Sequence, residues 1–88
     1  MFHPGEFIAE EMRARGWTQK ELAVRCGYSP QFISDLVNKR RGISPKCALA
    51  LALAFGTSAE FWLNLWNQYR LFNARSQYAL RDSARESL

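Results

Sequence analysis

The sequence holds few of the residues from which most catalytic and metal sites are built. Its 88 residues include two cysteines, Cys26 and Cys47, and one histidine, His3. A zinc site needs three or four ligands, and these three residues are too widely separated to form an obvious set. No paired catalytic carboxylates and no phosphate-binding loop appear either. The sequence therefore predicts no catalytic site, no metal and no cofactor, and His3 is expected to be a solvated residue ahead of the first helix.

Long apolar runs are also missing. No stretch of about 18 residues is free of charge, so no segment is expected to span a membrane. The first residues, Met1 to Glu6, lack the basic start and apolar run of a signal peptide, which favours the cytoplasm. In that compartment Cys26 and Cys47 are expected to be reduced thiols in the core, although a disulfide between them is conceivable.

The charge of the chain suits a polyanionic partner without proving one. The formal net charge is +4 and the pI is about 9.5, in a composition that is otherwise typical of a globular domain. The densest basic cluster is Lys39-Arg40-Arg41, with Lys46 shortly after it.

Capping signals predict three helices in the first half of the chain. Pro4 suits a first helical turn, and Gly16 ends the run that it opens. Thr18 and Glu21 form a capping box for a short second helix that ends at Gly27. Ser29-Pro30 opens a third helix, which Gly42 helps to end.

Similar signals predict two further helices. Ser44-Pro45 opens a helix through Phe55, which Gly56 stops, with Leu49, Ala52, Leu53 and Phe55 available for packing. Thr57 and Glu60 form a second capping box, and the fifth helix is expected to run to about residue 73. No strand signal competes, so the fold class is all-α. Residues 1–73 form the expected domain, and residues 74–88 are expected to be a loose polar tail.

Residues 18–40 have the pattern of a helix-turn-helix, a short helix, a tight turn and a second short helix. Small residues, Ala23 and Gly27, allow the two helices to cross closely. The third helix should point Phe32, Ile33, Leu36 and Val37 inward and Gln31, Ser34, Asp35 and Asn38 outward. Because the major groove of B-DNA admits one α-helix, this outer face is a candidate for reading DNA.

Several of the candidate DNA-contacting residues could have a structural role instead. Gln31 can pair with adenine through two hydrogen bonds, whereas Ser29 could serve only as a helix cap. Ser34 could touch a base or a phosphate, Asp35 could accept from cytosine or stay solvated, and Asn38 could cap the helix end. The basic cluster falls where backbone phosphates should pass. The predicted DNA-binding residues are Gln19, Ser29, Gln31, Ser34, Asn38, Lys39, Arg40 and Arg41.

The fifth helix carries more aromatic residues than one buried face can hold. Surplus aromatics are enriched in interfaces, so part of this helix is expected to form a two-fold dimer. Alternatively the tail folds back to cover the rings, or the rings stack on single-stranded nucleic acid, although no basic residues alternate with them. The predicted interface consists of Phe61, Trp66, Tyr69 and Phe72.

Several of these motifs resemble a known family. Thr18-Gln19-Lys20-Glu21-Leu22-Ala23, Gly27 and Ile33-Ser34 resemble the phage-repressor type of helix-turn-helix found in the Xre family. The segments 3–6 (HPGE), 38–43 (NKRRGI) and 60–65 (EFWLNL) resemble the HigA group of antitoxins. This resemblance implies a five-helix bundle that dimerises, binds a palindromic operator in its own promoter and neutralises a HigB toxin, a RelE-like ribonuclease that cuts messenger RNA on the ribosome.

Two other functions compete with the antitoxin. One is a stand-alone helix-turn-helix transcriptional regulator without a toxin partner. The other is a protein-interaction adaptor that has only the shape of the motif, which the combination of Gln31, Ser34 and the basic cluster argues against.

Overall fold

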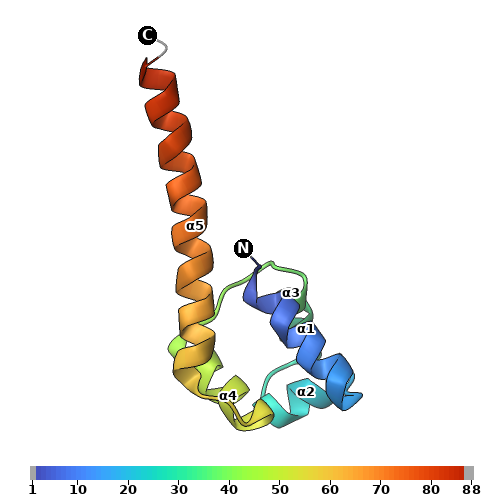
Figure 1. Ribbon diagram of the computed structural model, residues 1–88. Coiled ribbons are helices and arrows are strands. Elements are labelled where there is room, and N and C mark those ends of the chain that lie inside the picture. Colours follow the sequence, from blue (N-terminus) through green and yellow to red (C-terminus); the bar gives the residue numbers. More distant parts are fainter. Residues whose placement is uncertain (1, 87–88) are drawn as a thin grey trace.

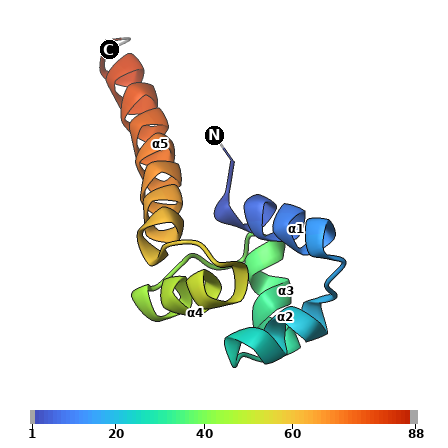
Figure 2. The ribbon, with the colours of Figure 1, turned by 60° about the horizontal axis from the view of Figure 1, so that its bottom comes forward.

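Residues 2–86, which the computed structural model describes, form five helices and no strand. The helices are α1 (Pro4–Arg15), α2 (Gln19–Cys26), α3 (Pro30–Val37), α4 (Pro45–Phe55) and α5 (Ala59–Glu86). The first four lie together, and α5 rises from the end of α4 and extends away from them (Figures 1 and 2). The predicted all-α fold class is confirmed.

The local signals that delimit these helices act as the sequence predicted. The capping box of Thr18 and Glu21 opens α2, and the hydroxyls of Ser29 and Ser44 accept hydrogen bonds from the backbone of α3 and α4. At the C-terminal ends of α1, α2 and α4, Gly16, Gly27 and Gly56 have φ of 67°, 75° and 72°. Glycine adopts this left-handed conformation at no steric cost, so these three positions stop their helices.

The core lies where α1, α2, α3 and α4 meet the first turns of α5. The contacting pairs are α1 with α3 and α5, α2 with α3 and α4, and α4 with α5. Trp62 is the largest fully buried side chain. The other buried apolar residues are Ile8, Met12, Leu22, Ala23, Ile33, Leu36, Ile43, Cys47, Ala48, Leu51 and Phe55.

Helix α4 buries a different face from the predicted one. Cys47, Ala48, Leu51 and Phe55 pack inward, whereas Leu49 and Leu53 are 60% and 87% exposed. The prediction was wrong for these two leucines. Because almost every residue of α4 is apolar, its sequence contains no hydrophobic periodicity that would select one face.

Helix α5 also begins differently. Ser58, not Thr57, caps it, because the Ser58 hydroxyl accepts a hydrogen bond from the backbone N–H of Phe61 at 3.1 Å. Thr57 instead accepts a hydrogen bond at 2.7 Å from the indole N–H of Trp62. The predicted capping box of Thr57 and Glu60 is therefore wrong, because a tertiary hydrogen bond uses the threonine hydroxyl.

The predicted end of the fifth helix near residue 73 is also wrong. α5 continues to Glu86, and the molecule measures 54 × 21 × 21 Å along its principal axes. The tail does not fold back over the aromatic residues, and Tyr78 is exposed. Residues 87–88 of the predicted tail lie outside the described residues. Within the described range, no helix combines the length and the apolar character needed to cross a membrane.

Both cysteines are free thiols, as predicted. Cys47 is fully buried and Cys26 is half-buried beside α4, with its sulfur 3.9 Å from the carbonyl oxygen of Ala50. Burial raises the pKa of Cys47 to about 11, and the neighbouring Cys26 adds to the increase. The Cys47 thiol is therefore protonated at neutral pH and acts as a small hydrophobic core residue.

Candidate nucleic-acid interface

Helix α3 is anchored by one face and leaves the opposite face open. Ile33 and Leu36 are fully buried, and Phe32 and Val37 pack against the same core. On the other side Gln31 is exposed, and Ser34 and Asp35 are partly exposed. The predicted orientation of α3 is confirmed, so its polar face is available to enter a groove.

The crossing of α2 and α3 depends on small residues and one aromatic pair. Ala23 is buried between the helices, and Gly27 makes the turn. After the turn the rings of Tyr28 and Phe32 stack with centroids 4.0 Å apart. The guanidinium of Arg41 lies 4.1 Å from the centroid of the Phe32 ring. This stack connects the start of α3 to the basic loop that follows the helix.

The polar side chains on the open face form a hydrogen-bonded network. The Gln31 amide donates to the Asp35 carboxylate at 3.0 Å, and the Asn38 amide donates to the Ser34 hydroxyl at 3.1 Å. Arg40 and Arg41 approach the same Asp35 carboxylate, at 3.8 and 4.0 Å. Asp35 thus accepts from the glutamine and lies close to both arginines, an arrangement that the sequence does not indicate because it depends on the path of the loop.

The structure brings most of the predicted DNA-binding residues to one side of the molecule. Ser29 caps α3, and Gln31, Ser34 and Asn38 follow along its open face. Arg40 is 66% exposed just beyond the helix. Gln19 is the first residue of α2, where the N-terminal end of the helix dipole favours an anion.

The end of α3 agrees with one expectation and differs from another. Asn38 is its C-cap, as one of the alternatives for this residue predicted, but the left-handed residue is Lys39, with φ of 64°, not Gly42. This conformation accompanies a salt bridge at 2.9 Å between the Lys39 ammonium and the Glu6 carboxylate of α1. A hydrogen bond to Glu6 raises the pKa of Lys39. Gly42 is required for another reason, because a Cβ there would overlap the ring of Trp66.

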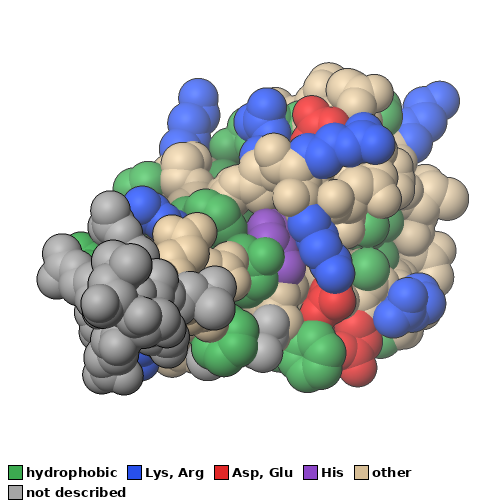
Figure 3. Space-filling model, turned by 90° about the horizontal axis from the view of Figure 1, so that it is seen from above, with side chains coloured by type: hydrophobic (Ala, Val, Ile, Leu, Met, Phe, Trp, Pro, Cys, Tyr) green, Lys and Arg blue, Asp and Glu red, His purple; other side chains and the backbone are tan. Residues whose placement is uncertain are grey.

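His3 is buried, and the prediction of a solvated histidine is wrong. It is the N-cap of α1, where its Nδ1 accepts a hydrogen bond from the Gly5 backbone N–H at 2.9 Å. Its ring packs edge-on against Trp66 and Tyr69 of α5, with centroids 5.4 and 4.9 Å apart. Figure 3 looks down on this region and shows the histidine between hydrophobic and charged side chains. The sequence shows no signal for this burial, because α5 supplies it.

The environment of His3 predicts a pH-dependent stability. Burial lowers the pKa of His3, and Lys39 lowers it further, whereas Glu6 and the Arg41 backbone act in the opposite direction. In unfolded chains histidine has a pKa of about 6.5, so below that pH the unfolded state binds more protons than the folded state. Stability contributed by neutral His3 is therefore complete above about pH 6.5 and is lost as the pH falls.

The measurement compares thermal unfolding of the wild type and His3→Asn between about pH 7.5 and 5.5. Asparagine is a good N-cap that does not titrate, so the melting temperature of the variant should fall less over this range. Because His3 is the only histidine, the difference reports this residue alone. Parallel melting curves for the two proteins at every pH would contradict the prediction.

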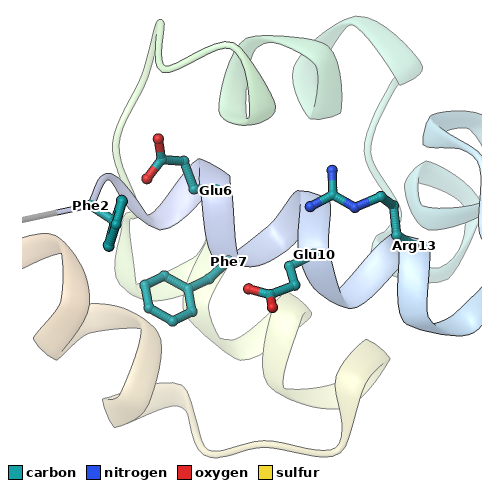
Figure 4. A pocket seen from close by; sticks show the side chains of 5 residues that line it. All are labelled: Phe2, Glu6, Phe7, Glu10 and Arg13. Atoms are coloured by element: carbon teal, nitrogen blue, oxygen red, sulfur yellow. The ribbon is translucent and has the colours of Figure 1, made fainter.

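A surface groove of about 490 Å³ lies along α1, lined by Phe2, Glu6, Phe7, Glu10 and Arg13. Figure 4 shows Glu6 and Phe7 leaving α1 on opposite sides, with Glu6 toward the segment after α3. No histidine or cysteine lines this groove. Among the described residues there is no group of three His, Cys, Asp or Glu side chains that could hold a metal ion.

Comparison with known proteins agrees with this geometry. Residues 8–62 match a helix-turn-helix family model. Virulence-associated protein I of Dichelobacter nodosus is 39% identical over 70 residues, which cover 78% of this chain and 65% of that protein, slightly less than two thirds. Antitoxin HigA-1 of Vibrio cholerae is 35% identical over 75 residues, covering 84% of this chain and 70% of the relative.

Solved structures share this fold over most of the chain. A putative antidote protein of a plasmid maintenance system from Nostoc punctiforme superposes with a TM-score of 0.92 at 29% identity, covering 99% of this chain and 96% of that one. The antitoxin HigA of Pseudomonas aeruginosa, solved with the higBA promoter, has a TM-score of 0.85 at 33% identity, covering 91% and 88%. This chain therefore belongs to the helix-turn-helix family, and within that family it is similar to the HigA-type antitoxins.

Proposed function

We propose that this chain is a sequence-specific DNA-binding repressor that is also the antitoxin of a type II toxin–antitoxin system. The observation that carries the proposal is the open polar face of α3, held from behind by the buried Ile33 and Leu36 and followed at once by two exposed arginines. The promoter complex of the similar HigA antitoxin supports it. The protein would act on operator DNA in the cytoplasm and repress its own operon.

In this proposal α3 lies in the major groove, and its flanks meet the phosphates. Gln31 is the first choice for a base contact, because its amide can donate to and accept from adenine once it leaves Asp35. Arg40 and Arg41 are placed for phosphates. The remaining residues of the proposed surface are Gln19, Ser29, Ser34 and Asn38, whereas the ammonium of Lys39 already binds Glu6.

The first experiment identifies the operator. Wild-type protein is used to select duplexes from a random-sequence pool, and a two-fold symmetric consensus is expected. Gln31→Ala should then relax the preference at one base position and cost roughly 1–3 kcal/mol on the selected duplex. Gln77→Ala, an exposed glutamine far along α5, is the matched control and should bind like the wild type. Unaltered base preference in Gln31→Ala would show that α3 is oriented differently.

Arg40→Ala tests the phosphate contact separately. This variant should weaken binding to all duplexes to a similar degree, and the slope of log K against log salt should become shallower by about one. Fluorescence anisotropy at several salt concentrations measures both quantities. A loss confined to the selected duplex, with the salt slope unchanged, would mean that Arg40 does not contact a phosphate.

We infer further that the protein is a homodimer joined through α5. Phe61 and Phe72 are 40% and 47% exposed and lie eleven residues apart, so they share one face of the helix. Trp66 and Tyr69, the other residues of the proposed interface, are half-buried against His3. Two copies would place two recognition helices about 34 Å apart, one turn of DNA. Light scattering that shows only monomer at micromolar concentration, with and without the selected duplex, would contradict the dimer.

The toxin partner is proposed from similarity to the antitoxins. It would be a HigB-like, RelE-like ribonuclease encoded beside this chain. Co-expression tests this: the product of the neighbouring reading frame should arrest growth alone and should not do so together with this protein. If no neighbouring frame is toxic, the antitoxin function fails, and the chain is a stand-alone helix-turn-helix transcriptional regulator.

A further inference from the structure

The start of α1 packs directly on the C-terminal end of α3. A Cβ on Gly5 would overlap the carbonyl oxygen of Leu36, so the two backbones are already in close contact. The two segments are more than thirty residues apart in the sequence.

The loop of residues 39–42 lies between this contact and α5. Gly42 lies against the Trp66 ring, and the Lys39 side chain binds Glu6 of α1. The loop is therefore held from α5 and from the start of α1. Arg40 and Arg41, the proposed phosphate contacts, are part of it.

Lys39 has an unusual position in this loop. It is the one non-glycine residue with positive φ among the residues that the structure describes. That conformation costs about 1–2 kcal/mol for a residue with a Cβ, and it persists only where the surroundings enforce it. The end of α3 holds this backbone, because the N–H groups of Lys39 and Arg40 donate to the carbonyl oxygens of Leu36 and Asp35 at 3.2 and 2.8 Å. The Lys39 ammonium is in turn held by Glu6 Oε1 at 2.9 Å.

Glu6 is partly enclosed by the fold, and 38% of its side chain is exposed. Its second oxygen, Oε2, is inaccessible to solvent and has no hydrogen-bond partner among the described residues. The carboxylate is therefore partly shielded from solvent, and it points from α1 toward the segment after α3 (Figure 4). Asp35 and not Glu6 approaches Arg40 and Arg41, so the two acidic residues divide the basic cluster between them.

We propose that Glu6 is a positioning residue for DNA binding, which holds the Lys39 ammonium as an internal tether for the loop of Arg40 and Arg41. Lys39 then fixes this loop and is not itself a phosphate contact. The inference rests on the proposed DNA binding. The basic cluster was predicted from the sequence to contact phosphates as one unit. In this proposal Lys39 has a structural role, and Arg40 and Arg41 contact the DNA.

A charge exchange tests this role. We compare the wild type, Glu6→Lys, Lys39→Glu and the double variant on the duplex selected by the wild type, by anisotropy over a range of salt concentrations. Each single variant should bind about 5- to 30-fold more weakly, because DNA must then order a released loop with two arginines. The double variant restores an opposite-charge pair and should return to within about twofold of the wild type, with the same salt slope.

The outcomes separate the two roles of Lys39. If Lys39 contacts a phosphate, Lys39→Glu and the double variant will bind DNA equally weakly, and the slope of log K against log salt will become shallower by about one or more in both. That result would overturn the proposal. Failure of the wild type to select or bind any duplex would instead refute the proposed function.

Lys39→Met gives an independent test if the charge-exchange variants do not fold, as judged by circular dichroism. It removes the charge and keeps a flexible side chain of similar length. If Lys39 is a tether, this variant should bind DNA more weakly but keep the salt slope of the wild type. The matched variant Arg40→Met should make the slope of log K against log salt shallower by about one. A lower slope in Lys39→Met as well would place its ammonium on the DNA and contradict the proposal.

Discussion

Replacing Trp62 with alanine is expected to cost the fold about 3–5 kcal/mol, a large part of the stability of a domain of this size. The side chain is completely buried where α5 meets the core, and its ring packs against Phe55 with centroids 5.7 Å apart. The variant also loses the hydrogen bond to Thr57. Urea unfolding followed by circular dichroism measures the difference, and a midpoint close to that of the wild type would contradict the prediction.

Two variants separate the contributions of Trp62. Trp62→Phe keeps most of the ring and removes the N–H donor, so it should cost little more than the hydrogen bond, about 1 kcal/mol, plus some packing. Leu53→Ala removes a large apolar side chain of α4 that is 87% exposed. It should destabilise the fold far less than Trp62→Ala. Equal losses in the two alanine variants would show that Trp62 is not the residue that fixes α5 to the core.

Replacing Gly5 with alanine is expected to destabilise the fold by about 2–3 kcal/mol and to lower the melting temperature by roughly 10–20 °C. Helix propensity alone predicts that Gly5→Ala stabilises the fold, since alanine is favoured over glycine within a helix by about 1 kcal/mol. The difference arises because the new methyl group would overlap the backbone carbonyl of Leu36. A backbone atom cannot move aside as a flexible side chain can, so α1 and α3 must separate.

Ala14→Gly provides the control for Gly5→Ala. Ala14 is exposed on the same helix, so its replacement should show only the propensity effect, about 1 kcal/mol of destabilisation. Thermal unfolding of both variants compares them directly. If Gly5→Ala melts at or above the wild-type temperature, the close contact between α1 and α3 is not present in solution.

Local signals predicted most helix boundaries, because capping depends on neighbouring residues. Thr18 with Glu21, the Ser-Pro pairs and the three left-handed glycines all act where the sequence placed them. The polar face of α3 was also predictable, since its apolar residues recur at helical spacing. The continuation of α5 beyond residue 73 had a signal too. No glycine or proline follows Gly56 to stop that helix, and the polar composition was mistaken for a loose tail.

The features that were missed depend on contacts between distant segments. No periodicity could show that Leu49 and Leu53 face outward, because either side of α4 is apolar enough to be buried. Nothing local to His3 predicts its burial against α5. The salt bridge of Glu6 and Lys39 joins residues that are far apart in the sequence, and Lys39 has a backbone conformation that lysine seldom adopts.

The uninterrupted course of α5 has a mechanical consequence. Its 28 residues form a rod about 42 Å long, whose first turns are clamped between α4 and α1. A tilt of about 5° at the clamped end would displace the far end by about 3–4 Å over that length. In the proposed two-fold dimer joined through α5, small changes in how its first turns pack against α4 and α1 would thus become ångström-scale changes in the distance between the two recognition helices.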